Sequence, residues 1–328
     1  MYPKLSKKEL SSLKQWKYSV VNLGITNILL NPFWNLVVKF LPLSLAPNVL
    51  TLCGLITGLG IWLVSELFYS IELVPIIILC YCVISTLDGI DGKQARKINN
   101  STPFGELFDH SVDIITLFVV TRISTIVFGI SNQLLMPVYI VTGGVFCWAH
   151  YYAYLDGHLT MGRFTGPNEV LSLIIIGYLT NSWINWGHML ASNIFYTFCF
   201  LVCVAMPFYL CYCINESEIS IISDLDKNYS INVNVARTSF IFMAALLINT
   251  FLWNISYIQL ICMFIMVNAE LIVTKMAQTN FRYELHLLCM GCLLNQWLAL
   301  IIMAYDVFTI FKQIKEYLGI PFLKVFVN

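Results

Sequence analysis

Residues 88–113 read DGIDGKQARKINNSTPFGELFDHSVD and hold four aspartates: Asp88, Asp91, Asp109 and Asp113. The flanking sequence is apolar enough to lie in a membrane, where one charged side chain costs roughly 2.5–3.5 kcal/mol on insertion scales. Asp88 and Asp91 are three positions apart and Asp109 and Asp113 are four apart, so each pair shares one helix face. The stretch therefore predicts two helices joined by a short turn, with the four carboxylates converging on a wet or metal-containing site.

The composition of the chain indicates an integral membrane protein. Of the 328 residues, 59% are hydrophobic and 11% are charged, and the mean hydropathy is +0.77. Soluble domains carry about 25% charged residues. The formal net charge is zero, so we expect no nucleic-acid partner. We predict an all-α polytopic membrane protein, a bundle of about nine or ten transmembrane helices, with an N-terminal amphipathic helix at the membrane interface.

Apolar stretches long enough to cross a bilayer recur along the chain, since one span needs about 20 residues. We predict spans at 48–68, 71–90, 104–130, 135–156, 168–185, 189–214, 236–253, 256–275 and 286–311, the second continuing to Arg96. The Lys-rich stretch 4–18 predicts the interfacial helix. These features predict four parts: an interfacial segment 1–47, a six-helix core 48–214 that holds the aspartates, a polar cytosolic linker 215–235, and C-terminal transmembrane helices 236–328.

The distribution of Lys and Arg among the loops predicts the orientation. With a cytosolic N-terminus, the cytosolic loops carry Lys or Arg, and the short loops between residues 69 and 255 on the other side carry none. The aspartates then lie at the cytosolic edge. Nine spans would place the lysines beyond residue 311 on the far side. Either the last segment contains a broken tenth span or the C-terminus departs from the rule, and the sequence leaves both open.

Carboxylate oxygens at this density favour Mg²⁺ or Mn²⁺. Four carboxylates can hold two ions bridged by phosphates, which is an arrangement used for phosphoryl displacement. The small residues Gly92, Ala95 and Gly105 would let a ligand approach the backbone closely. Lys93 and Arg96 are candidate phosphate contacts, because both are cationic and Arg can bind phosphate bidentately.

A second polar stripe accompanies the aspartates. Glu106 and His110 are four apart on the same predicted helix. A carboxylate can orient and tune an imidazole, so that it acts as a general base near neutral pH. An ordinary structural pair at a helix start is the alternative.

The fixed positions of residues 88–113, D-x2-DG-x2-AR-x8-G-x3-D-x3-D, resemble the signature of the CDP-alcohol phosphotransferase class-I family. The sequences APN at 46–48 and AHYYAYLDG at 149–157 are similar to those of the eukaryotic choline/ethanolamine phosphotransferase branch. The resemblance implies transfer of phosphocholine or phosphoethanolamine from CDP-choline or CDP-ethanolamine to diacylglycerol, with release of CMP. It implies a site that faces the cytosol from the endoplasmic reticulum membrane, with the Golgi membrane as the alternative.

The resemblance also implies roles for individual residues. The four aspartates would be metal ligands for two Mg²⁺ or Mn²⁺ ions, and Asp113 is also a catalytic candidate. Glu106 and His110 would activate the acceptor hydroxyl. The residues implied in substrate and nucleotide binding are Asn48, Gly92, Ala95, Arg96, Gly105, Glu169 and Tyr151. Partners would be the CDP-alcohol, diacylglycerol and membrane lipids, with a second copy of the chain as a candidate.

The choice of headgroup stays open. Choline favours an aromatic box around its quaternary ammonium, for which Trp148, Tyr151, Tyr152 and Tyr154 are candidates. Ethanolamine favours acceptors such as Glu or Asn. The alternatives to this function are another CDP-alcohol phosphotransferase, such as a phosphatidylinositol or phosphatidylglycerophosphate synthase, a membrane cation transporter, and an inactive scaffold.

Overall fold

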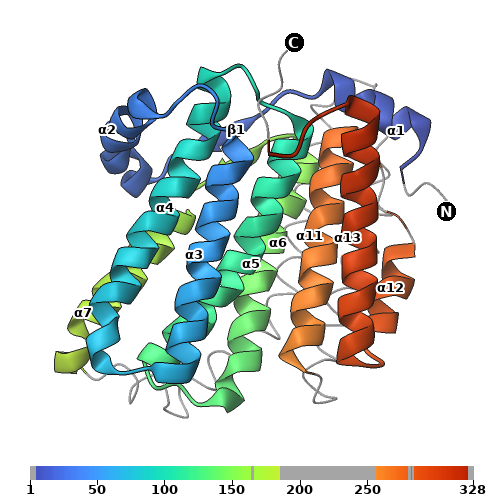
Figure 1. The fold of residues 1–328 in the computed structure, drawn as a ribbon. Coiled ribbons are helices and arrows are strands. Elements are labelled where there is room, and N and C mark those ends of the chain that lie inside the picture. Colours follow the sequence, from blue (N-terminus) through green and yellow to red (C-terminus); the bar gives the residue numbers. More distant parts are fainter. Residues whose placement is uncertain (1–4, 164–165, 185–255, 280–281, 283, 324–328) are drawn as a thin grey trace. The chain divides into compact units, whose positions relative to one another are not determined.

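The computed structural model describes residues 5–163, 166–184, 256–279, 282 and 284–323. These residues are mostly helical (Figure 1). Five helices in this part of the chain are long and apolar enough to cross a membrane: Pro47–Phe68, Ile71–Lys97, Pro103–Val127, Tyr257–Ala277 and Gln296–Leu318. The prediction of an all-α polytopic membrane protein is confirmed.

The described elements fall into two compact units. The first, here called the aspartate unit, comprises β1 (Val20–Asn22), α2 (Ile25–Phe40), α3 (Pro47–Phe68), α4 (Val74–Lys97), α5 (Pro103–Val127), β2 (Leu159–Met161), α7 (Pro167–Ile184) and the residues from Leu318 onward. The second unit comprises α1 (Lys7–Ser12), α6 (Leu135–Asp156), α11 (Tyr257–Ala277), α12 (Glu284–Cys292) and α13 (Gln296–Leu318) as far as Tyr317.

Helices α4 and α5 form the hairpin that residues 88–113 predict. Asn99 adopts a left-handed conformation (φ 53°), and Asn100 N donates to Ala95 O at 2.8 Å, which closes the end of α4. Thr102 caps α5 by accepting from Gly105 N at 3.0 Å, and Pro103 opens the helix. Helix α3 packs against both members of the hairpin. The hairpin places the two halves of the aspartate motif on neighbouring helices.

Helix α2 is fixed to α4 by charged and aromatic side chains. Trp34 is buried and lies directly against Gly89, where a larger residue would collide with the indole. The Lys97 ammonium donates to Val38 O at 2.8 Å and Leu41 O at 2.7 Å, so a cation caps the C-terminal end of α2. Helix α2 therefore supports the C-terminal part of α4, which carries Asp88 and Asp91.

The N-terminal region differs from the prediction. The helix expected over residues 4–18 covers only Lys7–Ser12, and a 3₁₀ turn at Leu13–Gln15 follows it. The longer helix is α2, whose outer face exposes apolar side chains: Ile28, Leu29, Phe33, Leu36 and Phe40. The clustered lysines led to the prediction of a helix over residues 4–18. Helix α2 was not predicted, because it carries few charged residues that would distinguish a polar face. The amphipathic surface therefore lies farther along segment 1–47 than its charge pattern indicates.

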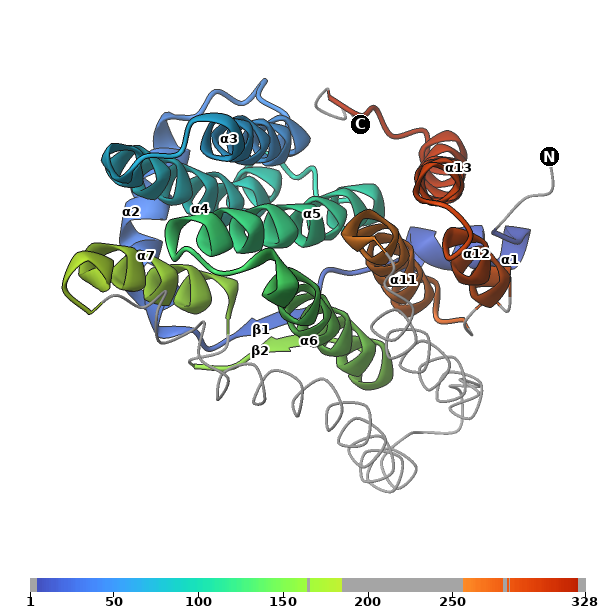
Figure 2. The ribbon, with the colours of Figure 1, turned by 90° about the horizontal axis from the view of Figure 1, so that it is seen from below.

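Two short strands tie distant parts of the aspartate unit together. β1 pairs in parallel with β2, with Val20 opposite Leu159, and the two strands lie side by side in Figure 2. Each strand has three residues, too few for an alternating pattern to appear in the sequence. The pairing holds the residues before α2 next to those before α7.

In the second unit α6 packs along α11. Tyr154 donates to Thr279 O at 3.1 Å, which joins the two helices at one end. Glu270 on α11 is fully buried and forms an ion pair with Arg282, whose backbone N–H also donates to it at 3.0 Å. A buried charge of this kind needs such compensation.

The prediction of one span over 286–311 is wrong. Helix α12 ends at Cys292, and α13 begins at Gln296 and continues to Leu318. The side chain of Asn295 accepts from Trp297 N at 2.8 Å, so a local cap starts the new helix. The predicted spans 189–214 and 236–253 and the predicted linker 215–235 lie outside the described residues. Their number and placement stay predictions.

Candidate active site

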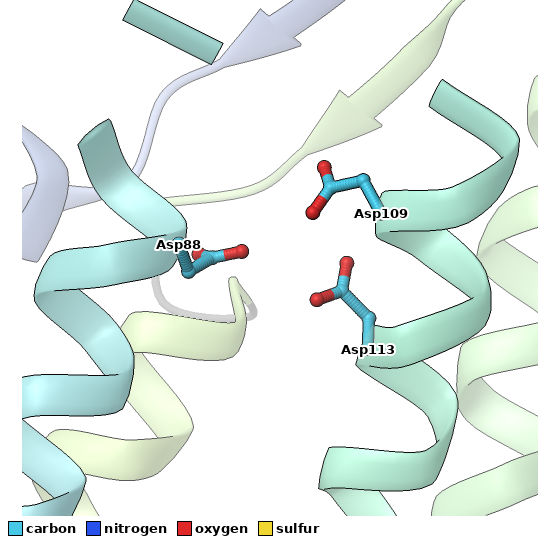
Figure 3. A group of neighbouring side chains, drawn as sticks. All are labelled: Asp88, Asp109 and Asp113. Atoms are coloured by element: carbon cyan, nitrogen blue, oxygen red, sulfur yellow. The ribbon is translucent and has the colours of Figure 1, made fainter. Parts of the chain in front are cut away.

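Three aspartates from the two hairpin helices point toward one another. Asp88 on α4 faces Asp109 and Asp113 on α5 (Figure 3), and one oxygen of each carboxylate lies within 4.8 Å of the others. All three residues are partly exposed. The arrangement follows from the sequence spacing, because residues four apart on α5 lie one turn above each other. Three acidic side chains thus meet at a partly exposed place between the two helices.

The fourth aspartate has separate support. Asp91 is buried, and its carboxylate accepts from Thr51 Oγ1 at 2.6 Å and from Gly92 N at 2.5 Å. Thr51 belongs to α3, so the third helix of the aspartate unit orients this carboxylate. The sequence reasoning missed Thr51. Its signal was a hydroxyl about one turn after Asn48, in the first turns of an apolar span.

The donor set suits a divalent cation. Oδ1 of Asp109 is buried, and no hydrogen-bond donor among the described residues reaches it. A buried carboxylate oxygen without a donor is costly, and so are negative charges held close together. A hard cation with oxygen ligands would satisfy both requirements. The aspartate cluster can therefore hold a divalent metal ion.

Glu106 and His110 line the same helix as Asp109 and Asp113. Both side chains are 5% exposed, and both interact with neighbouring groups. Glu106 lies in the first turn of α5, where its negative charge is favoured by the helix dipole. His110 follows Asp109 directly and lies one turn beyond Glu106. The structure thus buries the predicted acid–base pair next to the aspartates.

The predicted nucleotide residues fall in two places in the aspartate unit. On α4, the guanidinium of Arg96 folds back over Gly92, where a Cβ would lie 3.4 Å from its Nη1; Ala95 lies between these two residues in sequence. At the start of α5, a Cβ on Gly105 would lie 3.7 Å from Asn48 Oδ1. Gly92 therefore leaves room beside the guanidinium of Arg96, and Gly105 leaves room beside the amide oxygen of Asn48.

Comparison with known proteins identifies this arrangement. Residues 44–198 match the family model described as CDP-alcohol phosphatidyltransferase. These residues are therefore similar to CDP-alcohol phosphatidyltransferases, and for that likeness we call them the CDP-alcohol phosphatidyltransferase domain. The matched residues of this domain include all four aspartates, Glu106, His110 and the predicted nucleotide residues.

Curated relatives of the CDP-alcohol phosphatidyltransferase domain come from several eukaryotes. An uncharacterized CDP-alcohol phosphatidyltransferase class-I family protein 2 of Dictyostelium discoideum is 35% identical over 52% of this chain and 44% of its own length. Ethanolaminephosphotransferase 1 of Homo sapiens is 37% identical over 39% and 36%, and cholinephosphotransferase 1 of Mus musculus is 33% identical over 54% and 46%. The chain spans less than half of the length of each of these relatives.

Two predicted contacts of the CDP-alcohol phosphatidyltransferase domain have partners on α2. The ammonium of Lys93 bonds to the side-chain oxygens of Asn31 and of Asn35, the latter at 2.8 Å. Glu169 Oε1 accepts from Thr26 N at 2.8 Å at the start of α2. Both side chains thus fix α2 in place, and their predicted substrate contacts stay predictions.

The predicted headgroup residue Tyr151 lies on α6, in the second unit. It is 1% exposed, and its ring is tilted against that of Tyr154 at 6.3 Å between centroids. Of the four aromatic candidates for a choline box, Tyr151 and Tyr154 are thus ring neighbours. A role in binding the headgroup stays a prediction.

Tyr18 is a site residue that the sequence reasoning missed, and it lies outside the matched CDP-alcohol phosphatidyltransferase domain. Tyr18 is 46% exposed, yet partial removal of its phenol from solvent, followed by the negative charges of Asp109 and Glu106, raises its pKa. Strand β1 pairs with β2, and Leu159 N donates to Ser19 O at 3.2 Å, next to Tyr18 in the chain. This pairing holds Tyr18 near the aspartates. In the sequence Tyr18 stands among lysines and reads as an interfacial aromatic residue.

Proposed function

We propose that the chain transfers phosphocholine or phosphoethanolamine from CDP-choline or CDP-ethanolamine to diacylglycerol, with release of CMP. The observation that carries the proposal is the convergence of Asp88, Asp109 and Asp113 between α4 and α5, inside a CDP-alcohol phosphatidyltransferase domain. The names of the human and mouse relatives, ethanolaminephosphotransferase and cholinephosphotransferase, favour an amino-alcohol headgroup.

Asp88, Asp109 and Asp113 would hold Mg²⁺ or Mn²⁺, and Asp91, oriented by Thr51, would complete the ligand set for two ions. Such ions neutralise charge on the phosphates of the CDP-alcohol. Arg96 pairs with the diphosphate, since its side chain is exposed and a guanidinium can bind phosphate bidentately. Gly92, Ala95 and Gly105 leave space for the nucleotide, and Asn48 provides a polar contact.

In the chemical step the hydroxyl oxygen of diacylglycerol attacks the phosphorus that bears the amino alcohol. The new O–P bond forms as the P–O bond to CMP breaks. His110 accepts the hydroxyl proton, and Glu106 orients the imidazole and stabilises its charged form. Asp113 is the alternative proton acceptor. The burial of Glu106 and His110 supports this role, because water around the base would compete with the acceptor hydroxyl.

The proposal extends to the setting of the enzyme. We place the site at the cytosolic face of the endoplasmic reticulum membrane, or of the Golgi membrane. Residues 48–214 would form the catalytic core and residues 236–328 the remaining membrane helices, with a second copy of the chain as a candidate partner. The positive charge of the predicted cytosolic loops supports this orientation.

The test uses the purified full chain in mixed micelles with diacylglycerol and both CDP-amino alcohols in competition. We expect CMP release that needs diacylglycerol and a divalent cation, and product analysis reports which headgroup is preferred. Turnover of CDP-diacylglycerol alone would move the chain to another branch of the family. Cation flux in proteoliposomes without CMP release would overturn the enzymatic proposal altogether.

A further inference from the structure

The last described residues of the chain return to the aspartate unit. Gly319 adopts a left-handed conformation (φ 65°) directly after α13, which redirects the chain. Ile320 is 8% exposed, so the segment that follows is anchored by burial. We call residues 319–323 the C-terminal strap.

The strap contacts the first turns of α5. The ring of Phe322 meets Phe104 and Phe108 edge-on, with ring centroids 5.7 Å and 4.9 Å apart. This edge-to-face geometry is the favourable one for aromatic pairs. Phe104 is 2% exposed and provides a fixed surface. The strap is thereby docked beside Gly105, where the proposed nucleotide pocket begins.

One polar contact joins the strap to a proposed nucleotide residue. Asn48 Nδ2 donates to Phe322 O at 2.9 Å. A backbone carbonyl can only accept, so the amide must turn its NH₂ group toward the strap. Its Oδ1 then points the other way, to 3.7 Å from where a Cβ on Gly105 would lie. The strap therefore decides which end of the Asn48 amide faces the start of α5.

We propose that Phe322 is a positioning residue for nucleotide binding, which holds the Asn48 amide with Oδ1 presented as an acceptor at the Gly105 end of the pocket. The inference rests on the proposed function. Phe322 acts through Asn48 and contacts no reacting atom. Without the Phe322 carbonyl, the Asn48 amide would rotate between two orientations. In one of them the NH₂ group, a donor, replaces the acceptor Oδ1 on the side of the ligand.

The loss of one oriented hydrogen bond corresponds to a change in affinity of roughly threefold to tenfold. Phe322→Ala keeps the backbone carbonyl that accepts from Asn48 but removes the ring that docks the strap on Phe104 and Phe108. We expect the undocked strap to release the Asn48 amide, which raises the Kd for CMP by this factor and the KM for the CDP-alcohol similarly. The kcat should change less than about twofold, because the metal and base residues are untouched. Phe322→Tyr keeps the aromatic contact and should restore affinity. Leu323→Ala, at a neighbouring side chain that is 44% exposed, is the matched control.

A double-mutant cycle separates positioning from general damage. Because Phe322 acts through Asn48, the variant carrying Phe322→Ala and Asn48→Ala should bind CMP no more weakly than Asn48→Ala alone. Additive losses, an unchanged Kd in Phe322→Ala, or a fall in kcat at constant KM would each overturn the inference. Wild-type protein that binds no CMP would overturn the proposed function as well, whereas normal CMP binding with an indifferent Phe322→Ala overturns the inference alone.

Discussion

Replacing Thr51 by valine should weaken metal binding at a site that Thr51 does not itself ligate. The change keeps the shape of the side chain and removes the hydroxyl that donates to Asp91 Oδ2 at 2.6 Å. Asp91 is 5% exposed, so water cannot readily replace the lost donor. Of the two hydrogen-bond donors that reach this carboxylate from the described residues, only Gly92 N would remain.

The magnitude follows from the kind of bond that is lost. A hydrogen bond to a charged group contributes about 1.5–3 kcal/mol, which corresponds to roughly a 10- to 150-fold change in an equilibrium constant. Removal of groups that orient metal ligands commonly costs about 10- to 100-fold in affinity or activity. We therefore expect the Mg²⁺ concentration for half-maximal CMP release to rise at least about tenfold, a lower bound taken from these two ranges.

The assay is a Mg²⁺ titration of CMP release, repeated as Mn²⁺ binding followed by electron paramagnetic resonance. Thr57→Val is the matched control, because Thr57 lies on the same helix and its hydroxyl donates to that helix's own backbone, at Cys53 O, 2.8 Å away. If the Thr51→Val and Thr57→Val variants need the same Mg²⁺ concentration for half-maximal CMP release, the proposed role of Thr51 is refuted. This result would mean that the Asp91 carboxylate needs no help from α3.

Three further changes test other parts of the aspartate unit. Asp113→Asn should abolish CMP release while the purified protein keeps its elution volume in detergent, because it removes one of three converging anions; near-normal turnover would refute the ligand assignment. His110→Ala should lose turnover by roughly 100-fold or more, as general-base removal does, yet retain CMP binding by calorimetry, and a loss of binding instead would indicate a structural role. Arg122→Gln should lower the midpoint of thermal unfolding in detergent, with a free-energy cost of about 1 kcal/mol or less, because it breaks the pair with Glu66 at 2.6 Å; a large loss of activity at unchanged stability would contradict a purely structural role.

The parts of the fold that the sequence predicted are those with a local signal. The α4–α5 hairpin could be placed because Asn99 and Pro103 interrupt two apolar stretches, and because aspartates three and four positions apart must share a helix face. The break before α13 carried only a weak signal, the polar pair Asn295–Gln296 in an apolar run, and it was missed.

Contacts between distant residues had no such signal. Thr51 supports Asp91 from a position 40 residues away, and Phe322 reaches Asn48 across 274 residues. The three-residue strands β1 and β2 are also too short for any periodicity. The sequence therefore indicated the candidate catalytic and metal-binding residues, but it did not indicate the distant residues that position them.

The distance along the chain between Asn48 and Phe322 has a consequence for biogenesis. At synthesis rates of about 5–20 residues per second, the 274 positions between them correspond to roughly 14–55 seconds of translation. Asp88, Asp109 and Asp113 emerge early in that interval, so the ion-binding cluster can assemble while Asn48 still lacks its partner. On the proposed function, the orientation of the Asn48 amide would be fixed only after residue 322 has left the ribosome, so nucleotide binding would be a late step in the maturation of the nascent chain.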